Sequence, residues 1–154
     1  MARTVELLEE WMDGDLDRRR PARDLDDPGE VAELVRCFYA KVDVDDLLGP
    51  MFNEVARVDW PEHLVKLTAF WCRALFGIPG YQGNPFRAHA LVHARRPFTV
   101  EHFERWLTLF AQTLEDGWQG PKADQALGLA RKVAQVHAHQ LVGDVVVASG
   151  GVPG

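Results

Sequence analysis

Two histidines, His63 and His93, stand in surroundings that could support metal chemistry. His63 lies near the start of an amphipathic stretch that begins at Asp59, and His93 lies in a segment flanked by arginines and Pro97. Neutral imidazole is a common ligand of iron and other transition metals. One histidine on each side of an apolar slot suits a haem iron, because one ring can bind the metal while the other faces a gas ligand. Spacing alone fits an exposed histidine equally well, so the elements around the pair decide between these interpretations.

The composition indicates one globular domain that can bury a core. The chain has 154 residues, of which 47% are hydrophobic and 26% charged. Its net charge of -6 argues against binding to nucleic acid, and aspartates surround the only dense basic run, residues 18–20. Apolar runs fall short of the roughly 18 residues that a membrane span needs. Because the N-terminus is too acidic for a signal peptide, we expect a cytoplasmic protein that contacts neither membrane nor nucleic acid.

The chain contains two cysteines, Cys37 and Cys72, each within a stretch of helical periodicity. No pair has the Cys-x-x-Cys spacing that structural zinc sites use. We expect two buried free thiols, and a disulfide would require their two helices to cross at these positions.

Hydrophobic periodicity predicts an all-α fold with four substantial helices in two pairs. Asp27 can cap the first of these, with proline at the first helical position and Glu30 completing a capping box. Asp59 and Glu62 repeat this pattern, and Gly77 ends the helix that follows them. The two helices therefore have clear starting signals.

Residues 77–97 predict a long irregular connection, because five of their first nine positions are glycine or proline. Thr99 can cap the next helix, and Gly120-Pro121 can begin the last one, about 20 residues long. Small helical domains usually join neighbouring helices by short loops. A long loop that carries histidines opposite a histidine-bearing helix suggests that a bound group lies between them.

We expect three parts along the chain. Residues 1–26 would form an N-terminal extension, with a short amphipathic helix at 4–13 followed by a charged linker. Residues 27–143 would form the helical domain, and residues 144–154 a flexible C-terminal tail.

Six blocks in chain order resemble the truncated haemoglobins, specifically their third group. They are FYAKV at 38–42, LGPMFN at 48–53, WPEH at 60–63, FW at 70–71, YQGNP at 81–85 and HFERWL at 102–107. The similarity runs from about residue 28 to residue 142. It implies a globin-like two-over-two helical sandwich around a b-type haem.

The resemblance also implies roles for particular residues. Tyr39 matches the distal tyrosine, His63 the distal histidine, and Trp106 the tryptophan that lies along the haem. These three would donate hydrogen bonds to a bound gas or assist its chemistry as proton donors. Phe52 matches the phenylalanine that stacks on the haem.

The proximal iron ligand is implied to be His93, with His89 as the alternative. His93 is favoured because its distance to Pro97 and to the tryptophan of the following helix fits the family pattern. His89 lies four residues after Pro85, a spacing that the family also shows. The further cofactor contacts that we expect are Lys66, Leu67, Arg95, Arg96 and Phe98, the three cations being candidates for the haem propionates.

The function implied is binding of O₂, NO or CO at a histidine-ligated iron with a polar distal pocket. Each donor adds on the order of 1 kcal/mol, or about fivefold in affinity, so three donors favour slow release. Slow release suits NO dioxygenation or peroxide chemistry better than bulk oxygen transport, and turnover would need a separate reductase. The alternatives are a gas-binding or sensing module without turnover and a haem-free helical interaction protein.

Overall fold

The computed structural model describes residues 23–143, so the helix expected at residues 4–13, most of the charged linker and the tail at 144–154 lie outside the described residues. The elements in this range are α2 (Pro28–Val44), η1 (Met51–Val55), α3 (Trp60–Phe76), α4 (Pro85–Arg95), α5 (Val100–Gly117) and α6 (Pro121–Leu141). Within residues 23–143, β pairing is limited to one isolated bridge between Arg23 and Trp118. The all-α prediction is confirmed. None of the helices in this range is long and apolar enough to cross a membrane.

The helix starts predicted at Asp27 and Asp59 are confirmed by the structure. The Asp27 side chain accepts a hydrogen bond from the backbone N–H of Glu30 at 3.0 Å, which caps α2. Asp59 does the same for α3, with the N–H of Glu62 at 3.5 Å. Helix α3 ends at Gly77, whose φ of 70° is the left-handed conformation that glycine adopts without strain. Local capping interactions therefore determine the residues at which these helices begin and end.

The expectation that residues 77–97 are mostly loop was wrong, because α4 occupies Pro85–Arg95. Its N-cap is Asn84, whose side chain accepts from the N–H of Arg87 at 3.0 Å, and Pro85 takes the first helical position. All of the glycines and prolines that indicated a loop precede or begin this helix. Helix α4 has no fully buried residue, so the apolar periodicity that identifies a core helix is weak here.

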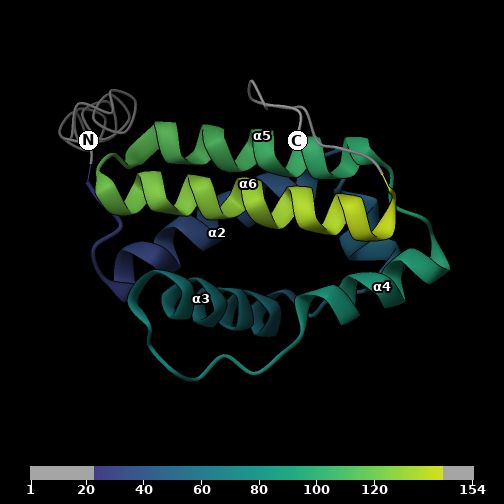
Figure 1. Ribbon diagram of the computed structural model, residues 1–154, viewed down its shortest axis with the longest axis horizontal. Coiled ribbons are helices and arrows are strands. Elements are labelled where there is room, and N and C mark those ends of the chain that lie inside the picture. Colours follow the sequence, from purple (N-terminus) through teal and green to yellow (C-terminus); the bar gives the residue numbers. More distant parts are fainter. Residues whose placement is uncertain (1–22, 144–154) are drawn as a thin grey trace, which may run out of the picture.

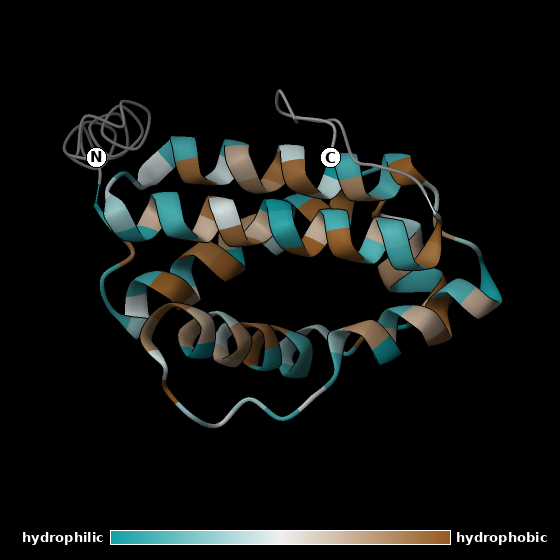
Figure 2. Ribbon diagram, viewed as in Figure 1, coloured by the Kyte–Doolittle hydropathy of each residue, from teal (hydrophilic) through white to brown (hydrophobic). Residues whose placement is uncertain are grey.

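The helices form two packed pairs, α2 with α3 and α5 with α6, and α2 also packs on α5. In Figure 1, α5 and α6 run side by side in one layer, while α3 and α4 lie in the other. In Figure 2 the hydrophobic residues, drawn in brown, gather on the sides of the helices that face the interior. Helix α2 contributes the periodic stripe predicted from the sequence, with Val31, Leu34, Val35, Phe38 and Val42 all at most 2% exposed. Burial of this stripe fixes the α2 face that turns toward α3 and α5.

An aromatic cluster joins the layers at the centre of this core. The Phe38 ring lies 5.5 Å from that of Trp106 and 5.1 Å from that of Phe110, both edge-on. Trp71 of α3 stacks on Phe110, with ring centroids 5.1 Å apart. Aromatic rings prefer edge-to-face and stacked arrangements at defined distances, in addition to the stabilisation from apolar burial. This cluster therefore sets the distance between the two helix pairs.

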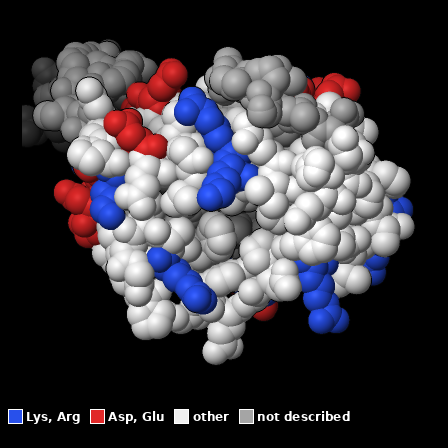
Figure 3. Space-filling model, in the orientation of Figure 1, with Lys and Arg blue, Asp and Glu red and all other residues white. Residues whose placement is uncertain are grey.

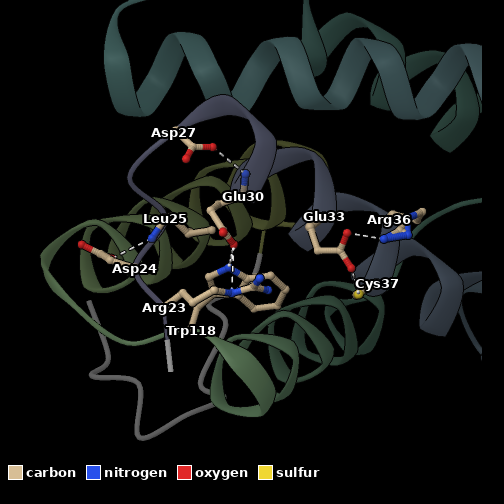
Figure 4. A network of polar contacts seen from close by, with 9 residues as sticks. All are labelled: Arg23, Asp24, Leu25, Asp27, Glu30, Glu33, Arg36, Cys37 and Trp118. Atoms are coloured by element: carbon tan, nitrogen blue, oxygen red, sulfur yellow. Dashed lines mark hydrogen bonds and ion pairs between the residues drawn. The ribbon is translucent and has the colours of Figure 1, made fainter. Parts of the chain in front are cut away.

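Residues 23–25, which precede the domain start expected at residue 27, pack against the helices. Leu25 is fully buried, and the Asp24 carboxylate accepts from the N–H groups of Lys122 and Ala123 at 3.1 and 2.8 Å, at the start of α6. Figure 4 shows Glu30 meeting Arg23 and the indole of Trp118, which donates to the Glu30 carboxylate at 2.9 Å. The last residues of the charged stretch thus attach α6 to the start of α2.

The two cysteines are free thiols, Cys72 buried and Cys37 half-buried. Burial raises the pKa of both thiols, and for Cys37 the neighbouring Glu33 carboxylate adds to this effect. Cys72 packs in the core as the buried thiol that was expected, whereas the half-buried Cys37 thiol donates to the Glu33 carboxylate at 3.8 Å.

Candidate functional site

A cavity of about 340 Å³ lies between the two layers. Figure 3 shows the face of the molecule hollowed between α6 and α3, with lysine and arginine side chains on both sides of the hollow. The cavity wall is mostly apolar, and it includes Phe52, Leu67, Phe70, Phe98 and Phe103. The side chains in the wall that can donate or accept hydrogen bonds are Tyr39, His63, Lys66, Tyr81, His89, His102, Trp106 and His137. An apolar slot with a few polar groups is the usual form of a cofactor site.

One wall carries a hydrogen-bonded pair from α2 and α5. The indole Nε1–H of Trp106 donates to the hydroxyl oxygen of Tyr39 at 3.3 Å. Because this bond uses an acceptor position of the phenol, the hydroxyl hydrogen of Tyr39 remains available to an acceptor in the cavity. Burial raises the pKa of Tyr39 to about 12, although the Trp106 hydrogen bond lowers it. Tyr39 is therefore a neutral phenol, and a hydrogen-bond donor, at physiological pH.

His63 of α3 lies beside this pair. Its ring centroid is 6.1 Å from that of Tyr39 and 5.9 Å from that of Phe52, both edge-on. Burial, and then the positive charge of Lys66, lower the pKa of His63. The neutral ring has one N–H donor and one bare nitrogen, so it can both donate to and accept from a ligand.

Phe52 is held in the same wall by η1, the wide turn that follows α2. The Ala56 N–H closes this turn on the Met51 carbonyl at 2.9 Å. The Phe52 ring stacks on Trp60 at 5.6 Å and an 18° interplanar angle. The segment Met51–Val55 forms a single π-helical turn.

His89 of α4 also lines the cavity. Its Nδ1 is buried and has no hydrogen bond among the residues that the structure describes. Burial, and then the proximity of His137, lower the pKa of His89 to about 4, with the carbonyl of Pro85 acting in the opposite direction. The ring is thus neutral at pH 7, which is the form that binds a metal ion.

The structure does not place His93 at the cavity wall, contrary to the expectation from the sequence. Its Nδ1 accepts the backbone N–H of Phe98 at 2.8 Å, and its ring stacks on Phe98 with centroids 5.9 Å apart. A neutral ring whose Nδ1 accepts a hydrogen bond carries its own hydrogen on Nε2, so neither nitrogen has a free lone pair. His93 in this arrangement joins the end of α4 to the start of α5.

The other expected cofactor contacts divide into two groups. Phe52, Lys66, Leu67 and Phe98 line the cavity, whereas Arg95 and Arg96 do not. The Arg95 guanidinium donates to the backbone carbonyl of Val55 at 3.0 Å, which ties α4 to η1. Arg96 is the exposed C-cap residue of α4.

Three polar residues that line the cavity were not predicted from the sequence to lie there: Tyr81, His102 and His137. His102 caps α5, because its Nδ1 accepts the Thr99 N–H at 2.9 Å. His137 lies on the apolar stripe of α6, where a core histidine with all its hydrogen bonds made is expected. It is buried, but only its Nδ1 has a partner, the carbonyl of Val133 at 2.8 Å. The periodicity of a sequence does not show whether a buried nitrogen lacks a hydrogen-bond partner. The position of His137 on the apolar stripe was therefore the one feature of the sequence that indicated its burial.

These features fit a haem group. The neutral imidazole of His89 lines the cavity from α4, and two neutral hydrogen-bond donors line it from α2 and α3. Most of the other side chains that line the cavity are apolar or aromatic, as an apolar macrocycle requires. Lys66 supplies a cation at the wall for an acidic substituent.

Comparison with known proteins agrees with the geometry. The sequence matches the family described as bacterial-like globin over residues 27–139, so the chain belongs to that family. It is therefore a haem-binding globin, and globins bind diatomic gases at the haem iron.

Within this family the chain is similar to the group III truncated haemoglobins, as the six sequence blocks predicted. It is 39% identical over 87 residues to the group 3 truncated hemoglobin ctb of Campylobacter jejuni, an alignment that spans 54% of this chain and 66% of that protein. The crystal structure of a group III truncated hemoglobin from the same organism superposes with a TM-score of 0.67 at 31% identity. That superposition covers 82% of this chain and 95% of the other, which confirms the globin fold.

Proposed function

We propose that this chain holds a b-type haem through His89 and retains a gas ligand for chemistry with NO or peroxide. The observation that carries the proposal is the hydrogen bond from Trp106 to Tyr39, which leaves the phenolic hydrogen free beside a neutral His63. Binding would be non-covalent, because the chain lacks the Cys-x-x-Cys-His spacing used for covalent haem attachment.

We assign the iron ligand to His89 rather than His93 because, of these two rings, only that of His89 has a nitrogen lone pair available to a metal. His89 lines the cavity with a neutral ring, while the Nδ1 of His93 is engaged by Phe98 and its Nε2 carries the hydrogen. Leu67 and Phe98 would pack against the macrocycle, with Lys66 as the partner of one propionate. When bound, haem supplies the iron that coordinates a diatomic gas and exchanges single electrons.

The distal residues would slow the release of a gas that carries partial negative charge. Tyr39 donates its hydroxyl hydrogen, and His63 donates the N–H of its neutral ring. Each bond contributes on the order of 1 kcal/mol, which is about fivefold in release rate. Trp106 acts through Tyr39, because its N–H is already directed at the phenol oxygen. Retention favours reaction of the ligand inside the pocket over its delivery elsewhere.

Two reactions suit such a pocket. NO dioxygenation joins O₂ and NO and adds one electron to give nitrate, so continued turnover needs a separate reductase. Peroxide reduction needs a proton at the departing oxygen, and Tyr39 or His63 could supply it. The remainder of the wall is mostly apolar, and hydrogen bonds in such surroundings are stronger than in water.

Single-turnover mixing with NO tests this proposal. Ferrous holoprotein loaded with ¹⁸O₂ would be mixed with NO, and nitrate measured by mass spectrometry. The proposal predicts about one nitrate per haem, with two labelled oxygen atoms, and slower oxygen release than in a His63→Leu variant. NO binding without nitrate, combined with no peroxide turnover, would favour a gas-binding or sensing module. Failure to take up hemin would leave a helical interaction protein.

A further inference from the structure

Two buried histidine nitrogens on the α4 side of the cavity lack partners. They are Nδ1 of His89 on α4 and Nε2 of His137 on α6, neither of which makes a hydrogen bond within residues 23–143. Their ring centroids are only 4.7 Å apart, at an interplanar angle of 76°. Buried polar atoms are rarely left unpaired in folded proteins, so two in adjacent rings require an explanation.

The protonation states of the two nitrogens are complementary. The Val133 carbonyl can only accept, so the 2.8 Å contact requires a hydrogen on Nδ1 of His137. A neutral His137 then presents Nε2 as a bare acceptor. If the Nε2 of His89 is the iron ligand, the hydrogen of that neutral ring lies on Nδ1, which makes it a donor. One unpaired donor thus lies in the ring next to one unpaired acceptor.

We propose that His137 is a positioning residue for the iron ligand, its Nε2 accepting the Nδ1–H of His89 when haem is bound. This inference rests on the proposed role of His89. The two nitrogens do not form a hydrogen bond in the structure, but the separation of 4.7 Å lets the rings meet through their nitrogens. His137 keeps its bond to the Val133 carbonyl, so the adjustment falls on the His89 ring, whose torsion about the Cβ–Cγ bond has broad minima.

The competing acceptor is the carbonyl of Pro85, one helical turn before His89. It lies close enough to influence the ring, but its geometry does not meet that of a hydrogen bond to Nδ1. The other rings at this site are Phe86, 6.2 Å from His137, and Phe98, 5.9 Å from His89, and neither is an acceptor of comparable strength. His137 is therefore the only nitrogen acceptor found beside this ring in the described range.

A hydrogen bond to the outer nitrogen of a metal-bound imidazole fixes the ring orientation and increases the basicity of the ligand. Loss of such a partner typically weakens metal binding by about 10–100-fold. His137 would thus hold the His89 ring with its Nε2 toward the cavity. It would also link α6 to the haem, because its Nδ1 is tied to the α6 backbone.

The test compares ferrous holoproteins by resonance Raman spectroscopy of the iron–histidine stretching band, together with their rates of haem dissociation. His137→Phe keeps a ring but removes the acceptor, His137→Gln retains an oxygen acceptor, and His89→Gly removes the ligand. His139→Leu is the matched control, because His139 is exposed on the same helix. Far-UV circular dichroism reports whether each variant folds.

We expect the band to move to lower frequency in His137→Phe, to recover partly in His137→Gln and to stay in place in His139→Leu. Haem dissociation from His137→Phe should be about 10–100-fold faster than from the wild type. A band that is lost in His89→Gly yet unmoved in His137→Phe would overturn the role of His137 and assign the bond to Pro85. A band that survives in His89→Gly would overturn the ligand assignment as well.

A measurement on the wild-type protein makes the test independent of variant folding. In the diamagnetic ferrous carbon monoxide form, ¹⁵N NMR can detect a scalar coupling across a hydrogen bond between two nitrogens. A coupling between His89 Nδ1 and His137 Nε2 would establish the bond directly. Absence of the coupling from resolved signals of both rings would refute it.

Discussion

Replacement of Tyr39 by phenylalanine should accelerate oxygen release from the ferrous holoprotein by about fivefold. The Tyr39 hydroxyl is buried, and its hydrogen is left free by the 3.3 Å bond that it accepts from Trp106. One net hydrogen bond is worth about 0.5–1.5 kcal/mol, which corresponds to roughly twofold to tenfold in rate. Phenylalanine keeps the ring that packs at 4.5 Å from Phe38, so the pocket shape should survive.

The same change also removes the acceptor of the Trp106 N–H. If the indole turns its N–H to the ligand, oxygen release accelerates less, toward the lower end of that range. If it stays in place, a buried donor is left unpaired at a cost of about 1–3 kcal/mol in the free energy of unfolding. Trp106→Phe alone should change oxygen release less than Tyr39→Phe, and the double variant should deviate from additivity because the two side chains are in contact.

The assay is stopped-flow displacement of oxygen by excess carbon monoxide, with unfolding by urea measured on the same samples. Carbon monoxide accepts hydrogen bonds more weakly than oxygen, so its own release rate serves as an internal control. Oxygen release unchanged in Tyr39→Phe, in protein with normal haem content and stability, would remove Tyr39 from the distal hydrogen bonds and refute this reasoning.

Two further predictions concern the stability of the domain. Asp24→Ala should lower the free energy of unfolding by about 1–2 kcal/mol, since it removes an acceptor for the Lys122 and Ala123 N–H groups at the start of α6. Asp24→Asn, which keeps an acceptor oxygen, should lose less in the same urea titration, and equal losses would contradict a capping role. In haem-free protein, the pKa of His89 is lowered to about 4 in the folded state from 6.5, so the unfolded chain binds the proton first. Stability should therefore fall as pH drops from 6.5 toward 4, by up to about 3 kcal/mol from this group, and His89→Leu should flatten that part of the urea-derived profile. An equally steep profile in His89→Leu would assign the acid sensitivity to other groups.

The helix starts could be predicted because their causes are local. A cap such as Asp27 or Asp59 acts on backbone groups three residues away, and Gly77 ends a helix through its own φ. Helix α4 was missed because its sequence follows a run of turn residues and its apolar face lines a cavity instead of a packed core. A bound group replaces the protein neighbours that would otherwise impose a stronger apolar pattern on this helix.

The choice between His89 and His93 could not be made from the sequence, because the two lie one helical turn apart on the same side of α4. Which one reaches the cavity depends on where α4 ends, and the hydrogen bond between His93 and Phe98 at that end occupies the His93 ring. The partnership of Tyr39 with Trp106, 67 positions apart, likewise depends on how α2 packs on α5. Residue types identified these side chains, whereas tertiary packing decided their partners.

The most direct test of the central claim is the absorption spectrum of ferrous protein reconstituted with hemin, for the wild type, His89→Gly and His93→Gly. The account predicts that His93→Gly keeps the Soret band of the wild type, and that His89→Gly loses or shifts this band and regains it on addition of imidazole. A wild-type Soret band in His89→Gly, together with its loss in His93→Gly, would contradict the account and return the iron to His93.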